Sequence, residues 1–383
     1  MKKFFFLAIP AALLAVACNK SAPVVDDSLD YVAPEENIST PEPVVFGTNV
    51  YAVTKTKAQG GIDAWNGKQS LRIFGFDRKV TDFTTAAFID DVAADSPADG
   101  TSGSINVYNP AVTQAQEPFY YSGNTCYDFY GYYVDDAVVG TVVRTAESIV
   151  YPVTIDGGQD LMIAKADQAV DVQGATSTVA EQHAYSAYSA RRGVQPKLVF
   201  QHLLSRFTFK IVKGTNSESA GDVQITSLTL AAKAEGNLCV VGAQRGVVAT
   251  STDLVDFELR EKSAEGVLGP LATNLSPAET ATQIGESILV FPGEESYTFT
   301  LKMKQTGVNT EPAPQSFTVT PAMVDTDSAQ DGLQPATAFE AGKNYTITIS
   351  IYGLEEVKIT AELTPWVEGG SVVIDPDDPS TWE

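Results

Sequence analysis

Short runs in which apolar and polar side chains alternate constrain the fold of this chain more than any other feature. In SYTFTLKMKQ, residues 296–305, Tyr297, Phe299, Leu301 and Met303 share one face of an extended strand, and threonine and lysine share the other. Successive side chains of a strand point to opposite faces, so this pattern indicates one buried and one solvated face. Comparable runs, separated by Gly, Asn, Asp and Pro, are VVFGTNVYAV, SLRIFGFD, SINVYN, YDFYGYYVDD, ESIVYPVTI, QITSLTLAAKA, NLCVVGA, ESILVFPG, SFTVTPAMV, NYTITISIYG and LEEVKITAELTPW. The sequence therefore predicts an all-β protein built of β-sandwiches.

The length of the chain and one polar segment predict two domains. The chain has 383 residues, more than a single domain of ordinary size contains. The stretch KGTNSESAG, Lys213–Gly221, separates two strand-rich halves. We expect an N-terminal β-sandwich domain over residues 44–213, a C-terminal one over 214–370, and a tail over 371–383.

The first residues have the pattern of an export signal. Lys2 and Lys3 precede an apolar run, Phe4–Ala17, which is too short to cross a bilayer core of about 30 Å as a helix. We expect residues 1–17 to be removed by cleavage between Ala17 and Cys18. The sequence LAVAC resembles a bacterial lipobox, in which the cysteine, here Cys18, carries the lipid; the usual leucine three places before it is replaced by alanine. The alternative is an ordinary secretory signal that is cut nearby.

The segment that follows is predicted to be a tether. Residues 18–43 contain many carboxylates and prolines and only one basic residue, Lys20. Such a composition cannot bury enough apolar surface to offset the entropy lost on ordering. We therefore expect a disordered, lipidated spacer between a membrane and the folded part.

The charge balance excludes some partners. The chain has 25 basic and 48 acidic residues, a net charge of −23. A nucleic-acid ligand or an anionic lipid surface would require a positive field, so neither is expected. If Cys18 carries lipid, Cys126 and Cys239 remain, and they could either form a disulfide in an oxidising compartment or stay thiols.

The sequence offers little catalytic chemistry. It contains no Gly-rich phosphate loop, GxSxG, HExxH or CxxC motif. Its two histidines are His183, in a loop-like stretch, and His202, which apolar neighbours place in the core or at a strand end. Acidic pairs that could support glycosidase chemistry are more simply surface residues: Asp90-Asp91, Asp135-Asp136, Glu294-Glu295 and Glu355-Glu356. We therefore expect no enzyme and no cofactor.

Two other groups of residues have the chemistry to bind calcium or sugars. Carboxylates that could bind calcium are Asp325, Asp327, Asp375, Asp377 and Asp378. They lack the spacing of a known calcium loop, so no metal site is predicted. The aromatic stretch FYYSGNTCYDFYGYYV could stack on sugars. Aromatic side chains at strand spacing more often pack in a core, and that role is the one expected here.

Several segments together resemble the fimbrillins, the subunits of type V pili of Gram-negative anaerobes, in their Mfa-like branch. They are the signal and tether, VVFG followed by TKTKA, SLRIFGFD, QDLMIAKAD, LVFQHLLSRFTFKI and the C-terminal AFEAGKNYTITISIYGLEEVKITAELTPWVEGG. The resemblance covers nearly the whole chain. It implies two transthyretin-like β-sandwich domains in a lipoprotein of the outer membrane and cell surface, within a fimbrium.

The resemblance also implies assembly by strand exchange. A trypsin-like extracellular protease would cut behind the first strand, which here would run from Val44 to about Val53 and include Val45, Phe46 and Val50. The family usually cuts after arginine, whereas the basic residues at that place are Lys55 and Lys57. The implied partners are other pilin subunits, with a host or bacterial surface ligand as a further partner.

The strand that one subunit would give to the next has one candidate in the C-terminal tail. The tail SVVIDPDDPSTWE offers Val372, Val373 and Ile374 as a donor strand. The sequence is equally compatible with a surface-exposed tail. The alternative function is a surface lipoprotein that binds glycan or protein and does not polymerise, or an adhesin at a pilus tip.

Overall fold

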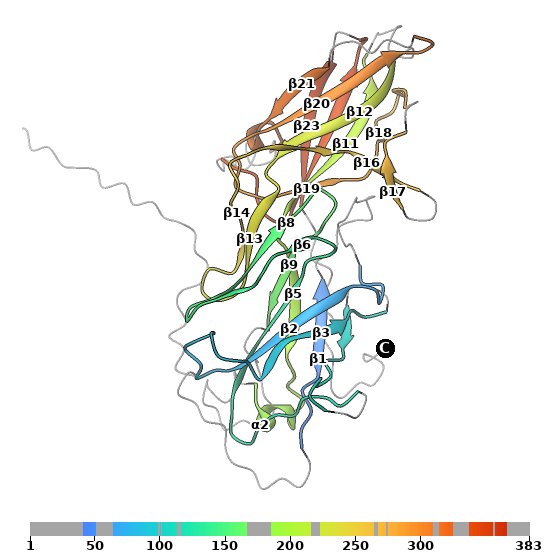
Figure 1. Cartoon of the computed structure of the whole chain (residues 1–383). Coiled ribbons are helices and arrows are strands. Elements are labelled where there is room, and N and C mark those ends of the chain that lie inside the picture. Colours follow the sequence, from blue (N-terminus) through green and yellow to red (C-terminus); the bar gives the residue numbers. More distant parts are fainter. Residues whose placement is uncertain are drawn as a thin grey trace, which may run out of the picture.

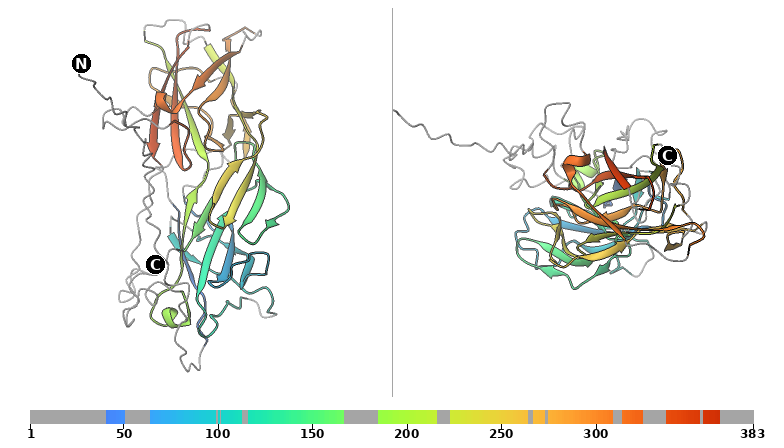
Figure 2. Two further views of the ribbon diagram at one scale, coloured as in Figure 1. Left: turned by 90° about the vertical axis from the view of Figure 1, so that its left-hand side faces the viewer. Right: turned by 90° about the horizontal axis from the view of Figure 1, so that it is seen from above.

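A computed structural model describes residues 41–50, 64–98, 100, 102–112, 116–166, 185–215, 223–263, 267–272, 275–308, 314–324, 337–354 and 357–365. These residues form an elongated stack of β-sheets, with the early strands at one end and the late strands at the other (Figure 1). Figure 2 shows the same arrangement from two further sides. Nearly all regular structure is β, which confirms the predicted fold class.

A seven-stranded sheet forms the end that carries the early strands. Its order is β3-β2-β5-β9-β10-β1-β4, and β1 lies parallel to β10, whereas the other pairings are antiparallel. The strands are β1 (Phe46–Val50), β2 (Ser70–Asp77), β3 (Ile89–Asp95), β4 (Ser102–Ile105), β5 (Tyr127–Tyr133), β9 (Met162–Lys165) and β10 (Lys197–His202).

Two sheets form the opposite end. One has the order β18-β11-β22-β23 with β19 also on β11, and the other has the order β15-β12-β20-β21. The strands are β11 (Ser205–Lys213), β12 (Val223–Ala232), β15 (Val255–Glu258), β18 (Thr282–Gln283), β19 (Ile288–Val290), β20 (Tyr297–Gln305), β21 (Gln315–Val319), β22 (Lys343–Ile351) and β23 (Val357–Pro365). In β20 the side chains of Tyr297, Phe299, Leu301 and Met303 are buried, as the alternation predicts.

A fourth sheet lies between these ends in Figure 1 and has the order β14-β13-β8-β6, with β7 also on β8. A two-stranded sheet and two short helices complete the regular structure of the described residues. The remaining elements are β6 (Val138–Val139), β7 (Val143–Arg144), β8 (Ile149–Thr154), β13 (Glu235–Val241), β14 (Gly246–Ala249), β16 (Arg260–Lys262), β17 (Leu268–Pro270), α2 (Ala187–Ala190) and α3 (Pro321–Val324).

The two halves of the sequence share strands. β11 precedes the boundary expected at residues 213–221, yet it pairs with β22 beyond that boundary. β13 follows the boundary, yet it pairs with β8 before it. One hydrophobic core accordingly contains side chains from both halves, among them Phe74, Tyr151 and Ile347. Hydrogen-bonded sheets therefore cross the expected boundary. The division into two domains at this boundary stays a prediction.

Both faces of the seven-stranded sheet are covered. Phe74, Phe76 and Tyr132 belong to the core that is shared with β8 and β13. Side chains of the opposite face, including Phe129 and Phe200, form a second core beneath the connecting segments. The aromatic stretch 119–133 contributes to both cores, as expected, and only Tyr120 among its aromatic side chains is exposed.

A buried polar cluster lies where β5 and β10 end and β9 begins. His202 Nδ1 is 2.9 Å from Asp160 Oδ2, and both side chains are buried. Asp135 accepts a hydrogen bond from the Tyr133 hydroxyl at 2.8 Å and one from the Asp160 amide at 3.4 Å. His202 is therefore a core residue at a strand end, as predicted.

The Asp135→Asn variant should be more stable than the wild type at neutral pH. Burial, with the nearby charges of Asp136 and Asp160, raises the pKa of the Asp135 carboxyl from 3.8 to about 6. A carboxyl that binds its proton more tightly in the folded state stabilises the fold below pH 4, and this contribution is lost as pH rises towards 6. Asp135 as a whole residue is exposed and only its carboxyl is shielded from water by its neighbours, so solvent screens much of this effect and we expect a gain of about 1 kcal/mol at pH 7.

Asparagine suits this position in other respects. Asp135 has a φ of 49°, a left-handed conformation that asparagine tolerates, and the amide oxygen can still accept from Tyr133. Urea denaturation at pH 4 and pH 7 measures the effect, with Glu147→Gln, which removes an exposed carboxylate elsewhere on the surface, as the control. Equal stability differences at both pH values would contradict the assignment of the titration to Asp135.

Candidate functional site

The first strand occupies an interior position in its sheet. Gly47, Thr48, Asn49 and Val50 of β1 pair in parallel with 197–200 of β10. On the other side, residues 46–49 pair in antiparallel fashion with β4. β1 therefore has a hydrogen-bonded neighbour along both edges, and its removal would leave a strand-wide slot between β10 and the edge strand β4.

One face of this first segment is buried. Val44, Phe46 and Thr48 are 4%, 0% and 2% exposed, whereas Val45 is 42% exposed. The Phe46 ring meets the edge of Phe129 with ring centroids 5.1 Å apart. The alternation of VVFGT thus places an aromatic side chain in the second core, and this burial holds the strand in addition to its backbone hydrogen bonds.

The paired segment begins before β1. The Val44 amide donates to the Phe119 carbonyl at 2.8 Å, and the Tyr121 amide donates to the Glu42 carbonyl at 2.9 Å. Pro43 and Tyr120 form an isolated antiparallel bridge. The attachment therefore starts at Glu42, two residues before the strand start expected from the sequence.

Several residues named from the sequence, some as predicted sites and some as candidates that were not favoured, lie outside the described residues, so the expectations for them stay predictions. They are Ala17 and Cys18 of the signal, Lys55 and Lys57 behind the first strand, His183, the acids Asp325, Asp327, Asp375, Asp377 and Asp378, and the donor residues Val372, Val373 and Ile374. The first strand, expected to reach about Val53, is described as far as Val50.

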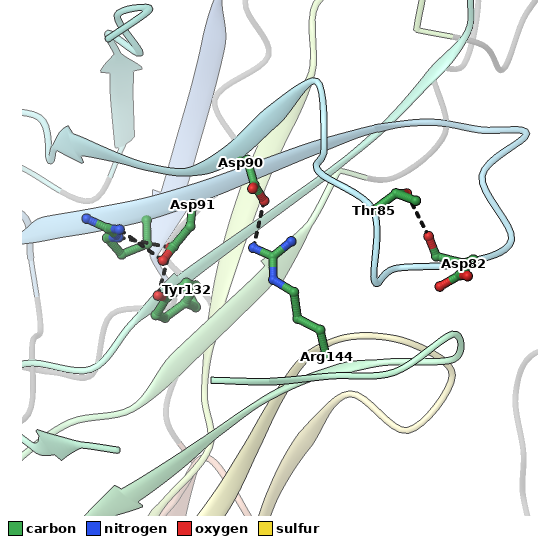
Figure 3. A network of polar contacts seen from close by, with 7 residues as sticks. Asp82, Thr85, Asp90, Asp91, Tyr132 and Arg144 are labelled. Atoms are coloured by element: carbon green, nitrogen blue, oxygen red, sulfur yellow. Dashed lines mark hydrogen bonds and ion pairs between the residues drawn. The ribbon is translucent and has the colours of Figure 1, made fainter. Parts of the chain in front are cut away.

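Both members of the acidic pair Asp90-Asp91 form ion pairs on the fold, whereas Glu355 and Glu356 lie outside the described residues. Asp91 accepts from Arg72 Nε at 2.9 Å and from the Tyr132 hydroxyl at 2.8 Å. Figure 3 shows Arg144 reaching Asp90 across two elements, and its Nη2 lies 2.7 Å from Asp90 Oδ1. Burial raises the pKa of Asp91, but the hydrogen bonds from Arg72 and Tyr132 outweigh it, so the pKa lies below its ordinary value. The Asp91 carboxyl therefore stays ionised, and the contacts of Asp90 and Asp91 join β3 to β2, β5 and β7.

The remaining chemical groups show no reactive arrangement in the part of the chain that the structure describes. Cys126 is buried, Cys239 is half-buried, and both are present as thiols. Within the described ranges, no group of three or more His, Cys, Asp or Glu side chains is placed to hold a metal ion. Likewise, no described helix is long and apolar enough to cross a membrane.

Comparison with known proteins decides the family. The model of the fimbrillin-like family matches residues 54–366, which is well over half of the chain. The chain belongs to the fimbrillin-like family. This membership confirms the resemblance found in the sequence, and it indicates a structural, non-enzymatic protein of the fimbrial cell surface. No curated protein matches this fimbrillin-like chain at a significant level.

Solved structures show a distant likeness. A Bacteroides uniformis protein provisionally assigned to cell adhesion is 16% identical with a TM-score of 0.48, and the match covers 85% of this chain and 99% of that one. The fimbrial anchor protein Mfa2 of Porphyromonas gingivalis is 12% identical with a TM-score of 0.33, covering 84% and 99%. The tip fimbrial protein Mfa3 of the same organism is 12% identical with a TM-score of 0.37, covering 84% and 99%. The family assignment rests on the sequence model and not on these structures.

Proposed function

We propose that this fimbrillin-like protein is a structural subunit of a cell-surface pilus that is assembled by protease-triggered strand exchange and supports adhesion. It would reach the outer membrane as a lipoprotein through Cys18. The observation that carries the proposal is the interior position of β1, with β10 on one side and β4 on the other.

Cleavage behind β1 would change how the strand is held. Lys55 and Lys57 lie in the connection between Val50 and the next described residues. Once that connection is cut there, only hydrogen bonds and the packing of the buried face, above all Phe46, retain β1. Loss of the strand would expose unpaired backbone groups of β10 and β4 and the apolar surface under Phe46, which favours binding of another extended segment.

A segment supplied by a neighbouring subunit would fill the slot. Such a contact joins different surfaces of two identical subunits, so it extends into a filament rather than closing a dimer. The tail segment Val372–Ile374 is the donor we propose, since its three apolar residues could enter a strand. The lipid anchor on Cys18 and cleavage by a trypsin-like extracellular protease are also parts of this proposal.

Limited trypsin digestion of the lipid-free protein from Asn19 tests it. We expect a new N-terminus after Lys55 or Lys57, identified by mass spectrometry, followed by a ladder of oligomers on a denaturing gel run without boiling. The matched control is the Lys55→Gln/Lys57→Gln variant, which should stay uncut at this place and monomeric.

The same experiment distinguishes strand exchange from the alternative function. A protein that is cut behind β1 and remains monomeric, or that resists cutting there, would contradict the strand-exchange proposal. Either result would favour a surface lipoprotein that binds glycan or protein without polymerising.

A further inference from the structure

We call the start of β1 its entry end. At this end, the ladder of hydrogen bonds between β1 and β10 meets Pro196. Gly47 pairs with Lys197, and the Gly47 amide donates to the Pro196 carbonyl at 3.0 Å. One step towards the start of β1, the parallel ladder requires an N–H from residue 196. Proline has no N–H, so the backbone of this segment cannot continue the ladder in the ordinary way.

The side chain of Gln195 makes up for this interruption. The Val45 amide donates to Gln195 Oε1 at 3.2 Å, and Gln195 Nε2 donates to the Pro43 carbonyl at 3.4 Å. A primary carboxamide offers one acceptor and one donor group, as a peptide group does, so it can pair with the backbone of the first segment beyond the proline. Gln195 thus extends the pairing from Gly47 back to Pro43.

A buried hydroxyl steadies this carboxamide. The Tyr121 hydroxyl donates to Gln195 Oε1 at 3.4 Å. Burial raises the pKa of Tyr121 well above its ordinary value, so the hydroxyl keeps its proton at neutral pH. The Tyr121 amide also donates to the Glu42 carbonyl at 2.9 Å, so Tyr121 contacts the entry end of the segment both directly and through Gln195.

We propose that Gln195 is a latch: its side chain holds the entry end of β1 by hydrogen bonds to the backbone of Val45 and Pro43. We further propose that Gln195 makes the same hydrogen bonds to the incoming strand that replaces β1. The second part rests on the proposed strand exchange. Because the latch contacts only main-chain atoms, it sets a rule for the incoming strand. The residue at the position of Val45 must have an N–H and therefore cannot be proline, whereas proline is accepted at the position of Pro43. The side chain at the position of Val45 can vary, because that position is 42% exposed.

Hydrogen exchange in the uncut full chain tests the latch. The Gln195→Met variant keeps the length of the side chain but removes both polar groups. We expect the amides of residues 45–48 to exchange about tenfold faster than in the wild type, as the loss of one or two hydrogen bonds predicts. The midpoint of global unfolding should change little. Gln195→Glu, which keeps only the acceptor, should give an intermediate rate, and Val45→Thr should exchange like the wild type.

Gln201→Met serves as the matched control, because Gln201 is an exposed glutamine of β10, the strand that begins two residues after Gln195. Wild-type exchange rates in Gln195→Met would overturn the latch, since they would mean that Gln195 acts only through packing. This test needs no cleavage or polymer, so it stands even if the strand-exchange proposal fails. If oligomer ladders form, those of Gln195→Met should dissociate at a lower temperature than wild-type ladders, and equal temperatures would overturn the role towards the incoming strand.

Discussion

The Phe46→Ala variant is expected to lose about 3–5 kcal/mol of unfolding free energy, the usual cost of removing a fully buried phenylalanine side chain. Phe46 is 0% exposed and packs edge-on against Phe129. The variant leaves a cavity in the second core directly beneath β1. Because β1 can open locally before the whole chain unfolds, part of this loss should appear as faster hydrogen exchange in residues 44–50.

Denaturation by guanidinium chloride, followed by tryptophan fluorescence, measures the total effect. The control is Val45→Ala, a neighbouring position on the exposed face of the same segment, which we expect to change stability by less than about 0.5 kcal/mol. Similar losses in the two variants would show that Phe46 does not anchor β1, and the proposed slot would then lack its main apolar contact.

Asp160→Ala should destabilise the fold by a similar amount, about 3–5 kcal/mol, because it removes one partner of a buried polar pair. Asp160 is 0% exposed, and its carboxylate oxygens lie 2.9 and 3.1 Å from His202 Nδ1. The variant leaves the imidazole buried opposite a void at the end of β10. The connection from β10 to β11 passes through this point, so the loss should weaken the packing of the seven-stranded sheet against the rest of the molecule.

A double-mutant cycle with His202→Ala tests the pairing itself. We expect the double variant to lose at least 1 kcal/mol less than the sum of the two single losses, as contacting residues do. Asp136→Ala, at an exposed position nearby, serves as the control. Additive losses would mean that the two side chains stabilise the fold independently, which contradicts the pairing.

Local strand structure could be predicted from the sequence because it depends on side-chain alternation. SLRIFGFD corresponds residue for residue to β2, and the alternation in residues 297–303 gave the buried face of β20 correctly. The strand β3, IDDVAAD, was not predicted, because its acidic and small residues have low strand propensity. Its pairing with β2 and the ion pair between Asp91 and Arg72 stabilise it instead.

The partners of the strands could not be predicted in the same way. Nothing in ESIVYPVTI indicates that β8 pairs with β13, since register and neighbours are decided by the packing of the whole molecule. For the same reason the sequence indicated a removable first strand through family resemblance alone. The neighbours β4 and β10, and the role of Gln195 beside Pro196, became visible only in the structure. A glutamine directly before a proline at a strand start carries no local signal of such a role.

The long sequence separation between β1 and its partner also determines when the strand can be added during folding. Thr48 donates to the Leu198 carbonyl although the two residues are 150 positions apart. Closing so large a loop costs entropy that β1 recovers only after β10 is in place. β1 therefore leaves the ribosome well before β10, yet it docks only after β10 is in place. Removal of β1 in the proposed assembly would therefore be the reverse of this docking step. It would return the sheet to the state that precedes the docking of β1.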